Sequence, residues 1–250
     1  MTCRRILGID LAWSARNPTG VVAIERSPPD RGWRFIGRWT VTSNDEIVEL
    51  VMSLGLETNP PGTTQVAPVL AIDAPLIAPN PGGTSRPADR EITRRFARFH
   101  AGAYPANQTL CPRPLALARR LESLGFSLDP KEALRERPTA IEVFPHAGAV
   151  GLFGLNRILK YKNGPVAQRR RELSRFQRLL REELPRLHPS VEPPPDGTIA
   201  HLRGAALKQR EDLLDAHLCA TVAAVYLDRP ERFDVVGDLE HGYVLVPRLS

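Results

Sequence analysis

Three apolar runs near the N-terminus predict three strands. The run RRILGIDLAW (4–13) is apolar on both faces, which is typical of a buried strand, and TGVVAIER (19–26) follows it across the turn-forming residues SARNP. The third run, WRFIGRWTV (33–41), has a period of two, so we expect an antiparallel hairpin followed by a half-exposed strand. The two expected faces of that third strand carry Trp33, Phe35, Trp39 and Val41 on one side, and Arg34, Arg38 and Thr40 on the other.

Helical periodicity follows in SNDEIVELVMSLG (43–55). Ser43 and Glu46 form a capping box at its start, and apolar side chains recur on one helical face up to the final glycine. After a linker rich in Pro and Gly, the runs APVLAIDAPL (67–76) and PTAIEVFPH (138–146) predict two more buried strands.

The remaining segments complete an α/β pattern. Residues 77–137 form an insertion rich in Pro, Gly and Arg, with short helical patterns at about 87–99, 114–124 and 130–136 and no expected strand. Long helices are expected at 166–184 and 204–228, and HGYVLVP (241–247) predicts an edge strand. We therefore expect one domain over residues 1–250. Its mixed sheet has three antiparallel strands followed by parallel strands, is flanked by helices, and carries the insertion between its fourth and fifth strands.

Five acidic residues stand in otherwise apolar settings. Asp10, Asp73 and Glu142 lie near the ends of predicted strands, and Asp212 and Asp215 head an apolar stripe on the last helix. A buried carboxylate costs several kcal/mol unless it is compensated. Hard divalent cations bind carboxylate oxygens, and two such ions can activate water for phosphodiester hydrolysis. These residues therefore predict a metal-dependent site for phosphoryl transfer.

A structural role stays open for each acid taken alone. A strand-end carboxylate often accepts hydrogen bonds from backbone N–H groups, and the first half of a helix favours acids such as Asp212 and Asp215 through its dipole. Three strands and one helix that each contribute an acid favour a shared site. The sequence contains no Walker glycine loop, no G-x-S-x-G motif and no H-E-x-x-H motif.

Two basic segments are candidates for phosphate binding. RPADREITRRF places Arg86, Arg90 and Arg94 at a helix start, and Lys160 and Lys162 precede the run Arg169 to Arg171. A solvated helix face is the alternative for both segments, and they serve a polyanion only if they lie on the side where the acids converge. His146, four residues after Glu142, is either a ligand or proton shuttle of the site or a residue that caps a local turn.

The net charge and the cysteines limit the classes of protein and the kinds of site that this sequence fits. The 250 residues carry a net charge of +6, which favours a polyanionic partner such as DNA or RNA, although many basic proteins of this size bind no nucleic acid. The cysteines Cys3, Cys111 and Cys219 are odd in number and form no close pair, which argues against disulfides and zinc and favours the cytoplasm. No signal peptide or membrane span is expected, and the sequence leaves the oligomeric state open.

The order of these elements and motifs resembles a known family. Together, GIDLAW, AIDAPL, RPADREITRRF, IEVFPH, YKNG with its arginine-rich helix, EDLLDAHLCA and HGYVLVP resemble the domain-of-unknown-function family 429, whose members are described as predicted RNase H-like nucleases. The resemblance extends from residue 6 to 247 and implies the RNase H-like fold of ribonucleases, resolvases and integrases.

The resemblance also implies roles for the five acids. Asp10 corresponds to the first-strand acid, which in this fold shares metal with an acid of the last helix, and Mg²⁺ or Mn²⁺ is the implied ion. The expected metal ligands are Asp10, Asp73, Glu142 and Asp215. Whether Asp73 or Glu142 completes the set, and whether Asp212 or Asp215 binds the ion, stays open at this point.

We therefore expect a hydrolase, a metal-dependent nuclease or phosphodiesterase. Two alternatives remain. One is a non-catalytic module on the same fold that binds nucleic acid or protein. The other is a nucleotide-binding kinase or ATPase of the actin-like superfamily, which shares the strand topology and a first-strand acid but would require a second glycine-rich phosphate loop.

Overall fold

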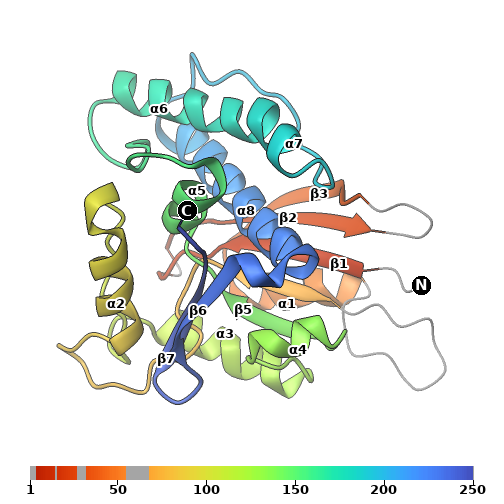
Figure 1. Cartoon of the computed structure of the whole chain (residues 1–250), viewed down its shortest axis with the longest axis vertical. Coiled ribbons are helices and arrows are strands. Elements are labelled where there is room, and N and C mark those ends of the chain that lie inside the picture. Colours follow the sequence, from red (N-terminus) through yellow and green to blue (C-terminus); the bar gives the residue numbers. More distant parts are fainter. Residues whose placement is uncertain (1–3, 15, 27–31, 55–67, 250) are drawn as a thin grey trace.

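The central sheet contains five strands in the order β3-β2-β1-β4-β5 (Figure 1). This computed structural model describes residues 4–14, 16–26, 32–54 and 68–249. The strands are β1 (Arg4–Asp10), β2 (Thr19–Arg26), β3 (Arg34–Val41), β4 (Val69–Ile72) and β5 (Thr139–Glu142). The first three pair antiparallel, whereas β4 is parallel to β1 and β5 is parallel to β4. The predicted mixed sheet is confirmed.

The third strand departs from the expected alternation. A bulge shifts the register between Ala23 and Ile24 of β2, which lie opposite Gly37 and Phe35, so that Ile36 is the extra residue. One inserted residue reverses the direction of every side chain that follows it. The expectation of a single apolar face was therefore wrong, and the apolar side chains divide between the two faces of the sheet, with Trp33 and Phe35 on one and Trp39 and Val41 on the other.

The parallel strands are shorter than their apolar runs, with four residues each. In the register of the sheet, Ile9 lies beside Ile72, and Ile72 lies beside Glu142. The carboxyl ends of β1, β4 and β5 therefore meet at one edge, which is where open α/β sheets place their ligands. This register brings Asp10, Asp73 and Glu142 to the same edge.

One face of the sheet is covered by α8 (Gly204–Asp228), whose predicted bounds are confirmed. Its backbone lies directly against β1 and β2. A Cβ atom at Gly8 would lie 1.9 Å from the carbonyl oxygen of Ala216, and one at Gly20 would lie 2.5 Å from that of Asp212. Glycine is needed at both positions because any side chain would push the helix away from the sheet.

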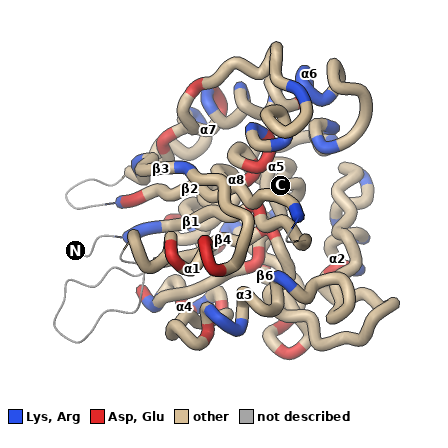
Figure 2. The backbone as a smooth tube through the Cα atoms, turned by 180° about the vertical axis from the view of Figure 1, so that it is seen from behind, with Lys and Arg blue, Asp and Glu red and all other residues tan. Residues whose placement is uncertain are grey.

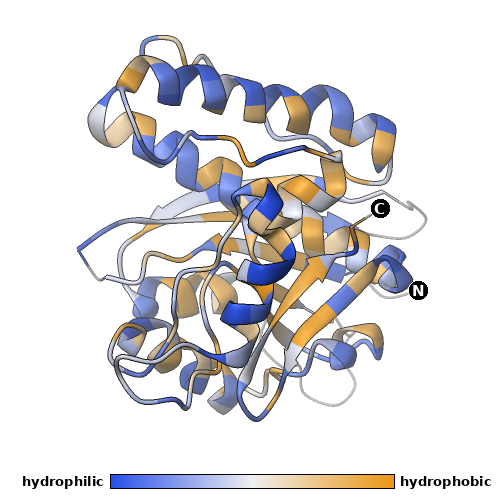
Figure 3. Cartoon of the chain, turned by 60° about the vertical axis from the view of Figure 1, so that its left-hand side comes forward, coloured by the Kyte–Doolittle hydropathy of each residue, from blue (hydrophilic) through white to orange (hydrophobic). Residues whose placement is uncertain are grey.

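The opposite face is covered by α1 (Asn44–Ser53) and α3 (Pro112–Ser123). The predicted N-cap of α1 is confirmed, because the Ser43 hydroxyl accepts a hydrogen bond from the Glu46 N–H at 3.1 Å; the Glu46 carboxylate accepts its return bond at 2.8 Å from the N–H of Thr42, one residue before the cap. The sheet strands are mostly apolar in Figure 3, and both faces contribute to the core.

Two elements were not predicted from the sequence. The helix α5 (Pro145–Phe153) begins inside the segment expected to be strand, so the strand at 138–146 ends earlier than predicted. Its residues are apolar on all sides and buried, so they lack the polar face that reveals a surface helix. The strand β6 (Phe233–Asp238) pairs antiparallel with β7 (Gly242–Pro247), the expected C-terminal strand, in a second, two-stranded sheet.

The insertion between β4 and β5 is helical, as expected. Its elements are α2 (Pro87–Phe96), η1 (Ala97–Phe99), α3 and α4 (Pro130–Leu134). Where it is described, the insertion contains no strand, only an isolated bridge from Ser127 to Thr139. The helix expected at 166–184 consists of α6 (Val166–Arg178) and a π-helical segment, η2 (Leu179–Glu183), and continues into α7 (Leu184–Leu187).

Two further expectations concern the cysteines and membrane-spanning helices. Cys111 and Cys219 are buried free thiols, whereas Cys3 lies outside the described residues. In the part of the chain that the structure describes, no helix has both the length and the apolar character needed to cross a membrane.

Candidate functional site

Asp10 and Asp73 lie side by side at the carboxyl edge of the sheet. Asp10 ends β1 and is 9% exposed, and Asp73 follows β4 directly. The backbone N–H of Asp73 donates to the carbonyl of Ile9 at 2.8 Å, which extends the parallel ladder by one residue and fixes the two carboxyl groups next to each other.

Asp212 and Asp215 come to the same place from α8. Asp10 is paired with Gly20 across the hairpin, and the backbone of Asp212 packs on that glycine, so this helical turn lies over the end of β1. Both helical carboxyl groups are buried, with 2% exposure for Asp212 and 0% for Asp215. We call Asp10, Asp73, Asp212 and Asp215 the aspartate cluster.

Two lysines bind the aspartate cluster. The Lys162 ammonium lies 2.9 Å from Asp215 Oδ2 and 4.0 Å from Asp73 Oδ2. Lys208, one turn before Asp212 on α8, pairs with the Asp212 carboxylate at 2.5 Å and with Glu211 at 2.8 Å. Four carboxyl groups thus face two ammonium groups, which leaves the cluster short of positive charge.

A tyrosine holds Asp215 in position. The Tyr161 hydroxyl donates to Asp215 Oδ1 at 2.5 Å, its ring stacks on Phe176 at 5.1 Å, and its backbone carbonyl accepts a hydrogen bond from Arg169 Nε at 3.0 Å. Arg169 also pairs with Glu211 at 3.2 Å. These contacts tie the first turns of α6 to the site.

Burial raises the pKa of most of the cluster. It is the main cause of the pKa of Asp10 lying well above its ordinary value; Lys162 opposes this, and the neighbouring acids add to it. Burial likewise raises the pKa of Asp73 to about 6 and raises that of Asp212, while a hydrogen bond with Asp10 lowers the pKa of both. These hydrogen bonds place the Asp10 carboxyl group between those of Asp73 and Asp212.

The cluster opens into a small cavity of about 230 Å³. Asp10, Asp73, Asp212 and the two lysines line it together with residues of the β1–β2 connection. Trp13 in that connection contacts Tyr104 of the insertion edge to face, with the ring centroids 5.8 Å apart. Acidic, cationic and aromatic side chains therefore line the cavity together.

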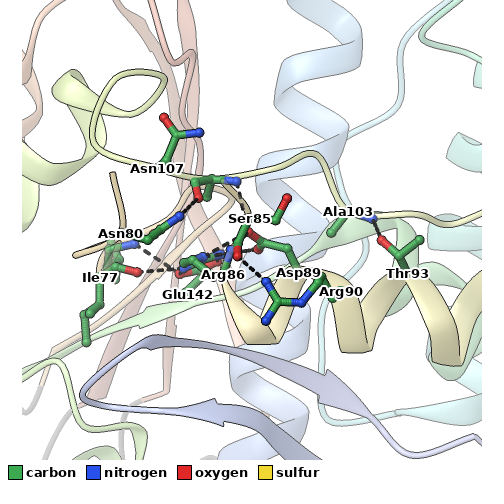
Figure 4. A network of polar contacts seen from close by, with 12 residues as sticks. Ile77, Asn80, Ser85, Arg86, Asp89, Arg90, Thr93, Ala103, Asn107 and Glu142 are labelled. Atoms are coloured by element: carbon green, nitrogen blue, oxygen red, sulfur yellow. Dashed lines mark hydrogen bonds and ion pairs between the residues drawn. The ribbon is translucent and has the colours of Figure 1, made fainter. Parts of the chain in front are cut away.

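Glu142 lies in a different group (Figure 4). Its carboxylate accepts two hydrogen bonds from Arg86, at 2.6 and 2.8 Å, and Arg86 also pairs with Asp89 at 2.7 Å. Arg86 is only 2% exposed, so it binds these two acids inside the protein and does not face solvent. Burial raises the pKa of Glu142 to about 7, against the effect of the guanidinium. We call Arg86, Asp89 and Glu142 the Arg86 cluster; it joins the end of β5 to the start of α2.

Most of the other predicted site residues lie on the surface, whereas Lys162 contacts the aspartate cluster. Arg90 and Arg94 are exposed on α2, where Arg94 pairs with Glu91 at 2.7 Å, and Lys160 is exposed. His146 is half-buried, 5.8 Å from the Tyr161 ring, and burial lowers its pKa to about 4. The structure thus brings Asp10, Asp73, Asp212, Asp215 and Lys162 together and leaves Glu142, Arg86, Arg90, Arg94 and Lys160 outside the cavity.

Lys208 and Tyr161 were not predicted from the sequence as site residues. A signal for Lys208 exists, because it precedes Asp212 by four residues and therefore shares its helical face. Tyr161 adjoins Lys162 in YKNG, but nothing in a single sequence shows that its hydroxyl faces an acid 54 residues away.

The donor atoms of the aspartate cluster suit a divalent cation. They are carboxylate oxygens, the ligands of Mg²⁺ and Mn²⁺, and Asp212 Oδ2 is buried without a hydrogen-bond partner among the described residues. Over the same residues, no group of three or more His, Cys, Asp or Glu side chains is spaced to hold an ion as it stands. Lys162 and Lys208 occupy oxygens that such an ion requires, so binding requires these lysines to release them.

Comparison with known proteins gives one family. Residues 8–238 match the family described as "Protein of unknown function (DUF429)". No curated protein matches the chain. The match covers the whole central sheet except the first residues of β1, and it includes every residue of the aspartate cluster.

Proposed function

This chain belongs to the DUF429 family, and we propose that it is a metal-dependent phosphodiesterase of the nuclease type with an RNase H-like fold. One observation carries the proposal: the carboxyl groups of Asp10, Asp73 and Asp212, from β1, β4 and α8, line one cavity, and with Asp215 behind Lys162 they face only two ammonium groups. A structural role for each acid alone does not account for this convergence, because strand-end and helix-start acids need only nearby backbone N–H groups.

The topology supports the fold part of the proposal. An antiparallel trio followed by two parallel strands, with the long α8 crossing the first strands, matches the arrangement expected from the resemblance. In this arrangement the acids of β1 and the last helix meet, as Asp10 and Asp212 do.

Each group in the site has a role in this reaction. Divalent metal, when bound, supplies an activated water and charge stabilisation for the leaving oxygen. Asp10, Asp73 and Asp212 are the residues that would hold it. The hydrogen bond from the Tyr161 hydroxyl keeps the Asp215 carboxylate oriented beside them. Lys162 and Lys208 pair with carboxylates of the cluster in the free protein and bind substrate phosphate once they are released from them.

The proposal is tested by cleavage of a panel of single-stranded DNA, duplex DNA, RNA and RNA–DNA hybrid with Mg²⁺ or Mn²⁺. We expect the wild type to cut at least one of these substrates. Asp10→Asn, which keeps the shape of the side chain, should slow cleavage roughly 100-fold or more, the usual effect of removing a group that stabilises a transition state.

Asp45→Asn is the matched control, because its side chain is 73% exposed on α1, and it should cut at the wild-type rate. Cleavage by Asp10→Asn at the wild-type rate would contradict the assignment. Binding of ATP by a wild-type protein that cuts no substrate would also contradict it and would favour the kinase alternative.

A further inference from the structure

A row of unpaired arginines lies on the solvent side of α6. Arg171, Arg175 and Arg178 are spaced by four and three residues, so they share one helical face, and all three are exposed. None of them forms an ion pair within the described residues. Several exposed arginines elsewhere are ion-paired, for example Arg186 with Glu183 at 3.0 Å and Arg135 with Glu132 at 2.5 Å. Figure 2 shows the basic positions that follow α6.

These arginines line an open groove of about 530 Å³ between α6 and the segment at Ala200. Arg170 is the fourth arginine of its lining, and no acidic residue contributes to it. Arg170 Nε donates to the carbonyl of Leu202 at 2.7 Å, which fixes the second wall of the groove to the helix. We call this feature the arginine groove.

The arginine groove begins close to the aspartate cluster. α6 starts four residues after Lys162, and Arg169 in its first turns contacts both the Tyr161 carbonyl and Glu211 of α8. In Figure 1, α6 lies across the N-terminal half of α8, the half that carries Asp212 and Asp215. A chain of linked phosphates bound in the groove would therefore lie along the helix whose first turns contact Tyr161 and α8.

We propose that the arginine groove binds the phosphate backbone of a nucleic acid and holds it for the aspartate cluster. From Arg171 to Arg178 the helix rises by about 10 Å, and one strand of a duplex carries a charge about every 3.4 Å along its axis. The row therefore reaches about two to three phosphates. The groove lining contains no aromatic side chain for base stacking, so it contacts the backbone without reading sequence.

The other face of α6 argues against a membrane surface as the partner. A helix that lies on lipid inserts its apolar side chains between the headgroups. In α6 and η2 the side chains of Leu173, Phe176 and Leu180 are packed in the core, at 1%, 0% and 0% exposure, and are not available for insertion, whereas Val166 in the first turn is 42% exposed. The exposed face therefore offers the arginines with a single large apolar side chain, which fits contact with phosphates in solution better than insertion into lipid.

The inference rests on the proposed phosphodiesterase function, and its test is independent of cleavage. Binding of a fluorescent oligonucleotide to the whole protein is measured in EDTA over a range of salt concentrations. Each phosphate contact contributes about 0.7 to 0.9 to the slope of log K against log salt. The triple variant Arg171→Ala, Arg175→Ala, Arg178→Ala should lower that slope by about 2 to 3.

A second triple variant, Arg120→Ala, Arg135→Ala, Arg186→Ala, is the control. It removes the same charge from exposed arginines that are ion-paired, and its slope should equal that of the wild type. Circular dichroism of both variants confirms that they are folded. An unchanged slope in the α6 variant would overturn the inference, and so would a wild type that binds no oligonucleotide. The inference would also be overturned if the α6 variant lost binding to phosphatidylserine vesicles but kept its binding to the oligonucleotide.

A small chromogenic phosphodiester separates this inference from the proposed function. The α6 variant should hydrolyse bis(p-nitrophenyl) phosphate with Mn²⁺ at the wild-type rate, because this substrate does not reach the groove, and a matching loss there would overturn the inference. A wild type that binds oligonucleotide through the groove but cuts neither substrate would contradict the proposed function and support the groove.

Discussion

At the scale of single residues, burial determines how much charge the aspartate cluster carries. Asp10, Asp73 and Asp212 all have a raised pKa, and burial is the first cause for each. The cluster therefore binds protons more tightly than free carboxyl groups do. A divalent cation would replace those protons, which couples metal affinity to pH.

This reasoning predicts the pH dependence of stability. The pKa of Asp73 rises from an ordinary 3.8 to about 6 on folding, so the folded protein binds this proton more tightly than the unfolded chain. The contribution of Asp73 to stability is complete below pH 3.8 and is lost as the pH rises through about 6. Without metal, the free energy of unfolding of the wild type minus that of Asp73→Asn should fall over this window, by up to about 1.4 kcal/mol per pH unit.

The measurement is urea denaturation of both proteins at several pH values in EDTA. Taking the difference is necessary because burial lowers the pKa of His146, His188 and His217 to about 4, which makes stability rise with pH over the same range. Asp45→Asn, an exposed control, should follow the wild type. A constant difference between wild type and Asp73→Asn would show that Asp73 titrates normally.

At the scale of elements, the site depends on how closely α8 lies on the sheet. Gly8 and Gly20 allow the helix backbone to contact the strands, and that contact sets the position of Asp212 over the end of β1. The helix and most strands were predictable because their periodicity is strong. The helix α5 was not predictable because a helix that is apolar on all sides has no polar face to detect. The bulge in β3 was not predictable because an inserted residue leaves no mark in the alternation of the sequence. The strand β6 was not predicted either.

Gly20→Ala tests this contact. Its Cβ would lie 2.5 Å from the Asp212 carbonyl oxygen and 3.0 Å from the Asp212 Cβ, so the helical turn has to move. We expect a loss of about 1 to 3 kcal/mol in the free energy of unfolding, measured in urea, because of overpacking. Gly102→Ala, whose Cβ would make only an ordinary contact with Thr93 at 3.6 Å, should change it much less. Equal stability of the two variants would contradict the close packing of α8.

At the scale of the whole molecule, two groups of buried charge share one edge of the sheet. The aspartate cluster opens into a cavity, whereas the Arg86 cluster is closed and joins the insertion to β5 (Figure 4). The five acids were identified from the sequence, and their pattern favoured a shared site. The sequence could not separate Glu142 from the others, because the partner that satisfies Glu142 lies 56 residues away, in the insertion. Local sequence patterns do not show which distant residue pairs with a given acid.

We propose that the aspartate cluster is a divalent metal centre. The most direct measurement is titration of Mn²⁺ into the metal-free protein, followed by electron paramagnetic resonance, for the wild type, Asp10→Asn, Asp212→Asn and Glu142→Gln. The account predicts that the wild type and Glu142→Gln bind Mn²⁺ alike, while Asp10→Asn and Asp212→Asn bind it at least roughly 10-fold more weakly. Equal binding by all four proteins, or a loss in Glu142→Gln alone, would contradict it.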